Sequence, residues 1–271
     1  MKKWRKFALA AVAGLSFLLV SIPTHAADKT IRLGSSPGPY SELFLNGIKP
    51  ILEKEGYTVK NTSFSDLLQA DVALSQGQLD LSVDQHTAYM DNFNENKKAD
   101  LVAFTPIPTV PTAIFPGQRK TLKAVKSGDK IGIPNDPANT ARAYRLLEKA
   151  GWIKLRKGVD PLQATKSDIV KNPHHLKFMG MDSAQIPRNL QDLAYGVVPG
   201  SVAYSAKLKP SASLLHENVV KQYELVAVTT KDKQNQPWVK AVKKAYRSKT
   251  FKKYLQKHNT NGYWFVPKEL K

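Results

Sequence analysis

The chain has 271 residues, of which 42% are hydrophobic and 23% are charged, a composition typical of a folded globular protein and unlike that of a disordered chain. It has no cysteine, which excludes disulfides, thiolate metal sites and any lipid anchor attached to an N-terminal cysteine. Lysine and arginine number 41 against 22 aspartate and glutamate, so the formal net charge is +19.

Residues 1–26 have the pattern of a secretory signal peptide. A positively charged start precedes an uncharged run over residues 7–20, and residues 24–26 are typical of a cleavage site. The apolar run is too short for a membrane-spanning helix, which needs about 20 such residues. We therefore expect cleavage after Ala26 and a mature protein that is soluble in the periplasm or outside the cell. Since no cysteine follows the cleavage site, we expect no lipid anchor.

The first half of the mature chain alternates between strand and helix patterns. Short β-branched runs predict strands, and apolar spacing of three and four residues predicts helices. A stretch over residues 101–114 is apolar but interrupted by prolines, so we interpret it as an extended crossover. The predicted strands are residues 30–34, 58–62 and 79–83, and the predicted helices are residues 40–55, 64–76 and 93–99.

The same alternation restarts in the second half. Residues 130–134 predict a strand, and residues 140–150 predict a helix that ends at Gly151. Two such α/β patterns predict two sheets, each rich in parallel strand pairs and covered by helices on both faces. The remaining predicted strands are residues 177–181, 196–198 and 224–229, and a long amphipathic helix is predicted over residues 238–258.

No pattern for catalysis or for a cofactor is present. The sequence has no H-E-x-x-H, G-x-S-x-G, Walker A or G-x-G-x-x-G motif. His174 and His175 are adjacent on a predicted extended loop, where neighbouring side chains point apart and do not easily share a metal. His86 has no evident catalytic partner. We therefore expect no enzymatic activity, no metal and no cofactor.

Basic and aromatic residues gather in the helix predicted over residues 238–258. Such interleaving occurs in nucleic-acid-binding proteins, but it also describes a solvated basic face whose aromatic side chains pack inward. An exported protein does not meet a genome, so we expect no nucleic-acid partner. A looser association with an anionic cell surface stays open.

Residues 133–142 carry the most specific functional signal in the sequence. A predicted strand ends there and turns into a helix N-terminus, where free backbone N–H groups favour an anion. Arg142 adds a guanidinium able to hold a carboxylate through two hydrogen bonds. The alternative is a capped helix with Arg142 exposed or salt-bridged. From the residues alone, both interpretations stay open.

This segment contains P-N-D-P-x-N-x-x-R, which resembles the signature of the NlpA/MetQ family of methionine-binding proteins, which serve ABC importers. Other segments resemble the same family in the same order, from about Ile31 to the last predicted helix. Residues 34–39 match the family's G-x-x-P-G-P. Residues 84–91 (D-Q-H-T-A-Y-M-D) resemble its F-Q-H-x-P-Y-L, and residues 185–192 (Q-I-P-R-N-L-Q-D) resemble its Q-L-P-R-S-L-D-D.

The resemblance implies a type II periplasmic-binding-protein fold, an α/β architecture of two lobes with a ligand cleft between them. Lobe 1 would be discontinuous, comprising residues 27–109 and 226–271, and lobe 2 would comprise residues 110–225. The implied partners are a small ligand and the permease and ATPase complex of an ABC transporter.

The resemblance also implies a set of ligand-binding residues. Asn139 and Arg142 would receive a ligand carboxylate, and Ser201 stands where the family has an amide. The pocket aromatics of the family are replaced at residues 108–111, so the implied ligand is methionine, a related amino acid or a short methionine-containing peptide. The alternative is a secreted surface or interaction protein that kept the fold and lost transport. The candidate residues are His86, Tyr89, Asn139, Arg142, Ser201 and Tyr223.

Overall fold

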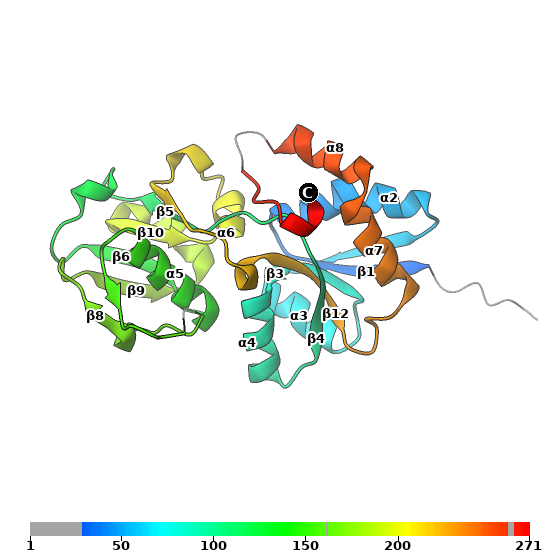
Figure 1. Ribbon diagram of the computed structural model, residues 1–271, viewed down its shortest axis with the longest axis horizontal. Coiled ribbons are helices and arrows are strands. Elements are labelled where there is room, and N and C mark those ends of the chain that lie inside the picture. Colours follow the sequence, from blue (N-terminus) through cyan, green and yellow to red (C-terminus); the bar gives the residue numbers. More distant parts are fainter. Residues whose placement is uncertain (1–28, 161, 260–262) are drawn as a thin grey trace, which may run out of the picture.

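The computed structural model has two α/β lobes that lie side by side (Figure 1). The structure describes residues 29–160, 162–259 and 263–271, so the predicted signal peptide and its cleavage site lie outside the described residues. Within these three ranges, no helix is long and apolar enough to cross a membrane.

The first lobe is built on a five-stranded sheet with the order β2-β1-β3-β12-β4. Strands β1, β2 and β3 run parallel to one another, whereas β12 returns from late in the sequence and runs antiparallel to both of its neighbours, β3 and β4. The lobe is therefore assembled from two separate parts of the chain. Its strands are β1 (Thr30–Ser35), β2 (Thr58–Ser63), β3 (Leu81–His86), β4 (Leu101–Pro106) and β12 (Leu225–Thr230).

Helices cover both faces of this sheet (Figure 1). The helix predicted over residues 40–55 is observed as three consecutive helical segments, of which the middle one, Phe44–Ile48, is a π-helix. The helices are α1 (Pro39–Leu43), α2 (Lys49–Lys54), α3 (Leu67–Ser75), α4 (Thr87–Lys97), α7 (Pro237–Arg247) and α8 (Lys249–His258).

The single helix predicted over residues 238–258 is wrong, because α7 and α8 are separate helices. Ser248 adopts an extended conformation between them, with ψ of 149°, and its Oγ accepts a hydrogen bond from the backbone N–H of Phe251 at 3.1 Å. A serine side chain that caps a new helix competes with continuation of the old one, which explains the break.

The aromatic residues of these two helices pack inward. Tyr246 is fully buried, and its ring centroid lies 6.3 Å from that of Phe44 and 5.2 Å from that of Phe251. These rings are part of the main apolar core of the first lobe. The structure thus supports the interpretation of a solvated basic face over the alternative in which these aromatic rings are free to stack on bases.

The second lobe has a five-stranded sheet with the order β11-β5-β10-β6-β9. In each of the two sheets, two of the four strand pairs are antiparallel, so the sheets are mixed and less parallel than the sequence predicts. The difference arises because a strand such as β12, which follows a connection from the other lobe, enters its sheet in the direction opposite to that of its neighbours. The main elements are β5 (Ala113–Pro116), β6 (Lys130–Pro134), β9 (Lys177–Met181), β10 (Tyr195–Val198), β11 (Leu215–His216), α5 (Pro137–Lys149) and α6 (Gly200–Ser205). A small antiparallel pair, β7 (Lys154–Leu155) and β8 (Ile169–Lys171), packs beside them.

Two segments, residues 107–112 and 217–224, connect the sheets. Thr109 is fully buried in the first, and its hydroxyl accepts a hydrogen bond from the backbone N–H of Leu225 at 2.9 Å, which joins the first connection to the end of the second. The C-terminal segment pairs with the same residue, since Phe265 N–H donates to the Thr109 carbonyl at 2.8 Å. The connections are therefore held at the base of the first lobe.

Gly200 lets helix α6 approach the first connection closely. A Cβ atom at this position would lie 2.3 Å from the carbonyl oxygen of Val110, far inside van der Waals contact with a backbone atom. We expect Gly200→Ala to lower the free energy of unfolding by about 1–3 kcal/mol, because the backbone must shift to relieve the overlap.

Chemical denaturation of the two proteins measures this loss. Gly180→Ala is the matched control, since its added Cβ would meet only the Cβ of Asn135 at 3.9 Å, and its stability should stay within about 0.5 kcal/mol of the parent. Equal stability of the two variants would show that α6 is free to move away from the connection.

Candidate functional site

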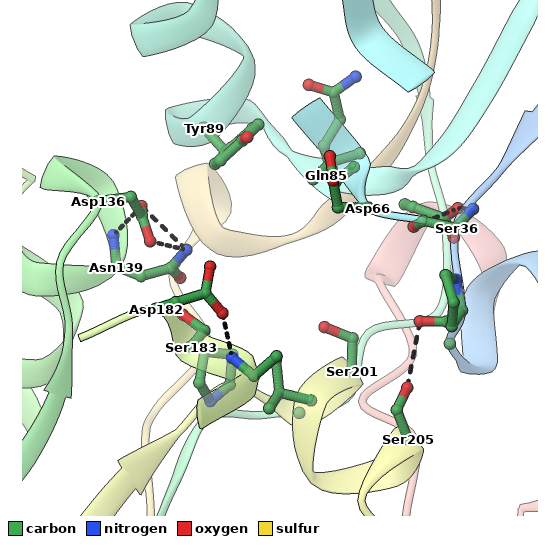
Figure 2. A pocket seen from close by; sticks show the side chains of 18 of the residues that line it. Ser36, Asp66, Gln85, Tyr89, Asp136, Asn139, Asp182, Ser183, Ser201 and Ser205 are labelled. Atoms are coloured by element: carbon green, nitrogen blue, oxygen red, sulfur yellow. Dashed lines mark hydrogen bonds between the residues drawn. The ribbon is translucent and has the colours of Figure 1, made fainter. Parts of the chain in front are cut away.

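A cleft of about 910 Å³ lies between the two lobes. In the first lobe, the C-terminal end of β3 and the start of α4 line the cleft. In the second lobe, the N-terminal ends of α5 and α6 line it (Figure 2). Five of the six residues predicted from the sequence line this cleft, namely His86, Tyr89, Asn139, Arg142 and Ser201. Residues far apart in the sequence are thus brought to one place.

His86 links the two lobes. Its Nδ1 accepts a hydrogen bond from the backbone N–H of Tyr89 at 3.1 Å and so caps α4, while its Nε2 lies 3.2 Å from Oδ1 of Asn139 on the other lobe. The acceptor role of Nδ1 leaves the proton on Nε2, which donates to Asn139. Burial and, after it, the nearby positive charge of Arg142 lower the pKa of His86 to about 3. The imidazole is therefore neutral at physiological pH.

Asp136 caps helix α5 and positions Asn139. Its carboxylate accepts from the backbone N–H of Asn139 at 2.9 Å and from the side-chain Nδ2 at 3.1 and 3.2 Å (Figure 2). The amide of Asn139 is consequently oriented with its oxygen toward His86. The first turn of α5 is already capped by a carboxylate of its own chain, in place of the free anion-binding end considered from the sequence.

Arg142 forms a buried ion pair with Glu217. The guanidinium donates from Nε to Glu217 Oε2 at 2.7 Å and from Nη2 to Oε1, and both side chains are less than a tenth exposed. Glu217 also accepts from the backbone N–H of Thr112 at 2.7 Å, so both interlobe connections contribute to this pair. Burial alone would lower the pKa of Arg142, but the paired carboxylate raises it. Of the two interpretations left open by the sequence, the structure shows a capped helix with a salt-bridged arginine.

Tyr223 lies one layer behind the cleft. The guanidinium carbon of Arg142 is 4.8 Å from its ring centroid, and the ring of His86 meets it edge-on at 5.3 Å. The hydroxyl of Tyr223 is buried without a hydrogen-bond partner among the described residues. Other atoms of Tyr223, together with Arg142, line a second cavity of about 630 Å³. Tyr223 thus supports the residues that face the cleft.

Ser201 lies in the first turn of α6, on the second lobe (Figure 2). The same helix touches the first lobe, because the hydroxyl of Ser205 donates to the carbonyl oxygen of Pro37 at 3.1 Å. The lobes therefore meet on both sides of the cleft, at this contact and at the pair of His86 and Asn139.

Sequence reasoning missed three side chains that shape the site: Asp84, Asp136 and Glu217. The Ser/Thr/Asp/Asn preference at helix N-caps could have identified Asp136. No signal pointed to Glu217, which is 75 residues from Arg142 in the sequence. Asp84 lies two residues before His86 on β3, and its Oδ2 accepts from Ser36 N–H at 2.8 Å and from the hydroxyls of Ser36 and Ser41 at 3.0 and 2.6 Å.

The described residues contain no group of three or more histidine, aspartate or glutamate side chains placed to hold a metal ion. What the cleft offers is a set of neutral and charged hydrogen-bonding groups on two lobes. This arrangement is suited to holding a small polar ligand.

The low pKa of His86 predicts a pH dependence of stability. A histidine whose pKa falls from 6.5 to about 3 on folding takes up a proton more readily when unfolded, so stability is lost as pH falls from about 6.5 toward 3. His86→Asn keeps a side-chain acceptor for the α4 cap and removes the titration. We expect the parent to lose about 1–2 kcal/mol more than this variant between pH 7 and pH 5.

Denaturant titrations of both proteins at the two pH values give this difference directly. Because the other buried carboxyls are common to both, their contributions cancel in the comparison. Parallel pH profiles would mean that His86 is protonated as easily in the folded protein as in the unfolded chain.

The chain resembles known proteins over nearly its whole length. The model of the NlpA lipoprotein family matches residues 31–267. The D-methionine-binding lipoprotein MetQ of Yersinia pestis is 31% identical over 244 residues, covering 89% of this chain and 90% of the relative. A nutrient-binding protein from Burkholderia cenocepacia, whose structure was solved bound to methionine, shares 33% identity, with a TM-score of 0.81, and the match covers 87% of this chain and 99% of that one. The substrate-binding protein of a methionine transporter from Streptococcus pneumoniae shares 29% identity, with a TM-score of 0.79, and covers 88% and 96% of the two chains. This chain belongs to the NlpA lipoprotein family.

Proposed function

We propose that this protein is the exported solute-binding protein of an ABC importer and that its ligand is methionine, a related amino acid or a short methionine-containing peptide. The observation that carries the proposal is the cleft itself, in which His86 and Asn139 meet from opposite lobes around a cavity of about 910 Å³. The relatives support this ligand class, since one is a D-methionine-binding lipoprotein, one is bound to methionine and one is the substrate-binding protein of a methionine transporter.

Capture would couple to closure of the lobes. Residues 27–109 and 226–271 would move as one lobe and residues 110–225 as the other, with the two connections as the hinge. Strand membership supports this division, because β1 to β4 share a sheet with β12 while β5, β6, β9, β10 and β11 form the other sheet. A ligand that contacts both lobes stabilises the closed arrangement by the difference between its affinities for the two states.

The candidate residues have distinct roles in this proposal. Tyr89 forms an apolar wall, and His86 and Asn139 supply a donor and an acceptor that exchange their mutual bond for bonds to the ligand. Arg142 attracts the ligand carboxylate, with Glu217 holding the guanidinium in place. Ser201 offers a hydroxyl from the second lobe, and Tyr223 supports Arg142 from behind.

The proposal includes no chemical step and no cofactor. The partners would be the permease and ATPase of the importer, and the site of action would be the periplasm or the outside of the cell. The curated relatives are named lipoproteins, whereas this sequence has no cysteine to carry a lipid, so we propose that it acts without that anchor.

Isothermal titration calorimetry with L-methionine, D-methionine and glycyl-L-methionine tests the proposal. At least one of the three should bind with a dissociation constant in the micromolar range or below. The competing idea, a surface or interaction protein without transport, requires that no amino acid or dipeptide binds and that none raises the melting temperature.

Glu217→Gln tests the role of Arg142. The substitution keeps the shape of the side chain but removes the competing carboxylate, so affinity for the bound amino acid or dipeptide should rise by about 1 kcal/mol, roughly fivefold. Glu269→Gln is the control, since Glu269 is more exposed and pairs with Lys221 away from the cleft. An unchanged affinity in Glu217→Gln would show that the ligand carboxylate does not bind to Arg142.

A further inference from the structure

Asp84 lines the cleft, and one of its two carboxylate oxygens has no hydrogen-bond donor among the described residues. Its Oδ2 receives three hydrogen bonds, all from the neutral groups of Ser36 and Ser41. Its Oδ1 is buried and has no hydrogen-bond partner among the described residues. A buried carboxylate oxygen without a donor is unfavourable, so this position calls for a donor, preferably a charged one.

The surroundings of Asp84 make a cation the fitting donor. Two of the residues that line the cleft are basic, Arg142 and Arg188. Four are acidic: Asp66, Asp84, Asp136 and Asp182. The charge of Arg142 is already balanced by Glu217, so acidic groups predominate. This excess of negative charge is found on a chain whose formal net charge is +19. The cleft therefore favours positive charge where the rest of the molecule repels it.

A second buried carboxylate lies behind Asp84. Asp71 is fully buried, and its Oδ1 accepts from the side-chain amide of Gln85 at 2.7 Å, whereas its Oδ2 has no partner among the described residues. The two carboxyls influence each other, since the charge of Asp84 adds to burial in raising the pKa of Asp71. Burial also raises the pKa of Asp84. A ligand cation beside Asp84 would offset the burial and hold this carboxyl in its ionised form.

Asp84 of the first lobe and Arg142 of the second lobe line the same cleft. The Tyr40 side chain lies in the wall of the same cleft. Burial raises the pKa of its hydroxyl most, the charge of Arg142 lowers that pKa, and the charge of Asp84 raises it. The hydroxyl is fixed by the Val110 backbone, whose N–H donates to it at 3.2 Å. An amino acid lying across Tyr40 could direct its carboxylate to Arg142 and its ammonium to Asp84.

We propose that Asp84 is the ammonium receptor of the cleft, its carboxylate accepting a hydrogen bond from a primary ammonium of the ligand. The inference rests on the proposed function and narrows it, because ligands without a primary ammonium are then excluded. The ammonium can be the α-ammonium of a free amino acid, the N-terminus of a dipeptide or the side chain of a basic amino acid, and Asp84 recognises their shared chemistry.

Asp84→Asn tests the proposal by calorimetry with matched ligands. The variant keeps one carbonyl oxygen for Ser36 and Ser41 but removes the charge. The ligands are L-methionine, its analogue with a hydroxyl in place of the ammonium (2-hydroxy-4-(methylthio)butanoate), glycyl-L-methionine and L-lysine. We expect the parent to favour its best ammonium ligand over the hydroxyl analogue by about 30-fold or more, and Asp84→Asn to reduce this preference to about threefold or less.

Asp66→Asn is the control, because it removes the same charge from the exposed rim of the cleft and asparagine can still cap α3. It should keep the preference for the ammonium ligand. A preference that survives in Asp84→Asn overturns the proposal, as does a parent protein that binds the hydroxyl analogue equally well. The ligand that loses most affinity in Asp84→Asn identifies which ammonium is recognised.

The outcome remains decisive if no methionine derivative binds, a result that would reject the proposed ligand class. Melting temperatures are then measured with L-lysine, L-arginine and putrescine. Stabilisation of the parent that is absent in Asp84→Asn and retained in Asp66→Asn supports the ammonium receptor on its own. No stabilisation of the parent by any of these cations contradicts it.

Discussion

A buried positive charge, the guanidinium of Arg142, organises the junction between the two lobes. A charge removed from water is costly unless it is paired and hydrogen-bonded. Here Glu217, in the connection over residues 217–224, forms both the ion pair and the hydrogen bonds with the guanidinium. The same guanidinium lies over the ring of Tyr223 and lowers the pKa of His86 on the opposite lobe. One ionised group therefore couples helix α5, the connection before β12 and the end of β3.

This coupling explains why the cleft walls are preorganised. Asp136 caps α5 and turns the amide of Asn139, His86 caps α4 and faces that amide, and the two lobes meet where these side chains touch. A ligand does not need to order these groups on entry, which reduces the entropic cost of binding. It must instead exchange existing contacts for its own, so selectivity depends on how well its charged ends match the groups already present.

Local signals in the sequence were sufficient for most of the fold. Strands β6 and β9 were predicted with their observed bounds, because a short apolar run ends at a proline in one case and lies between polar loops in the other. The break at Ser248 was missed, since the apolar periodicity continues across it while the cap depends on backbone geometry. The mixed character of the sheets was missed because strand direction follows from long connections that local patterns do not encode.

The site was predictable only where the chemistry lies in a contiguous segment. Asn139 and Arg142 stand three residues apart on one helix, and the family resemblance drew attention to them, as it did to His86 and Tyr89. Glu217 could not be found this way, because an ion pair over 75 residues has no local pattern. The unsatisfied oxygen of Asp84 was equally hidden, since its meaning depends on which donors surround it in three dimensions.

The central claim, that this cleft holds a small molecule with a carboxylate and an ammonium group, is tested most directly by the ligand that the protein carries. Protein purified without added ligand is denatured, and the released small molecules are identified by mass spectrometry and quantified against the protein. The account predicts an amino acid or short peptide, with methionine as the leading expectation, in an amount that approaches one per chain. A stoichiometric ligand with neither group, such as a sugar or a metal ion, would contradict it.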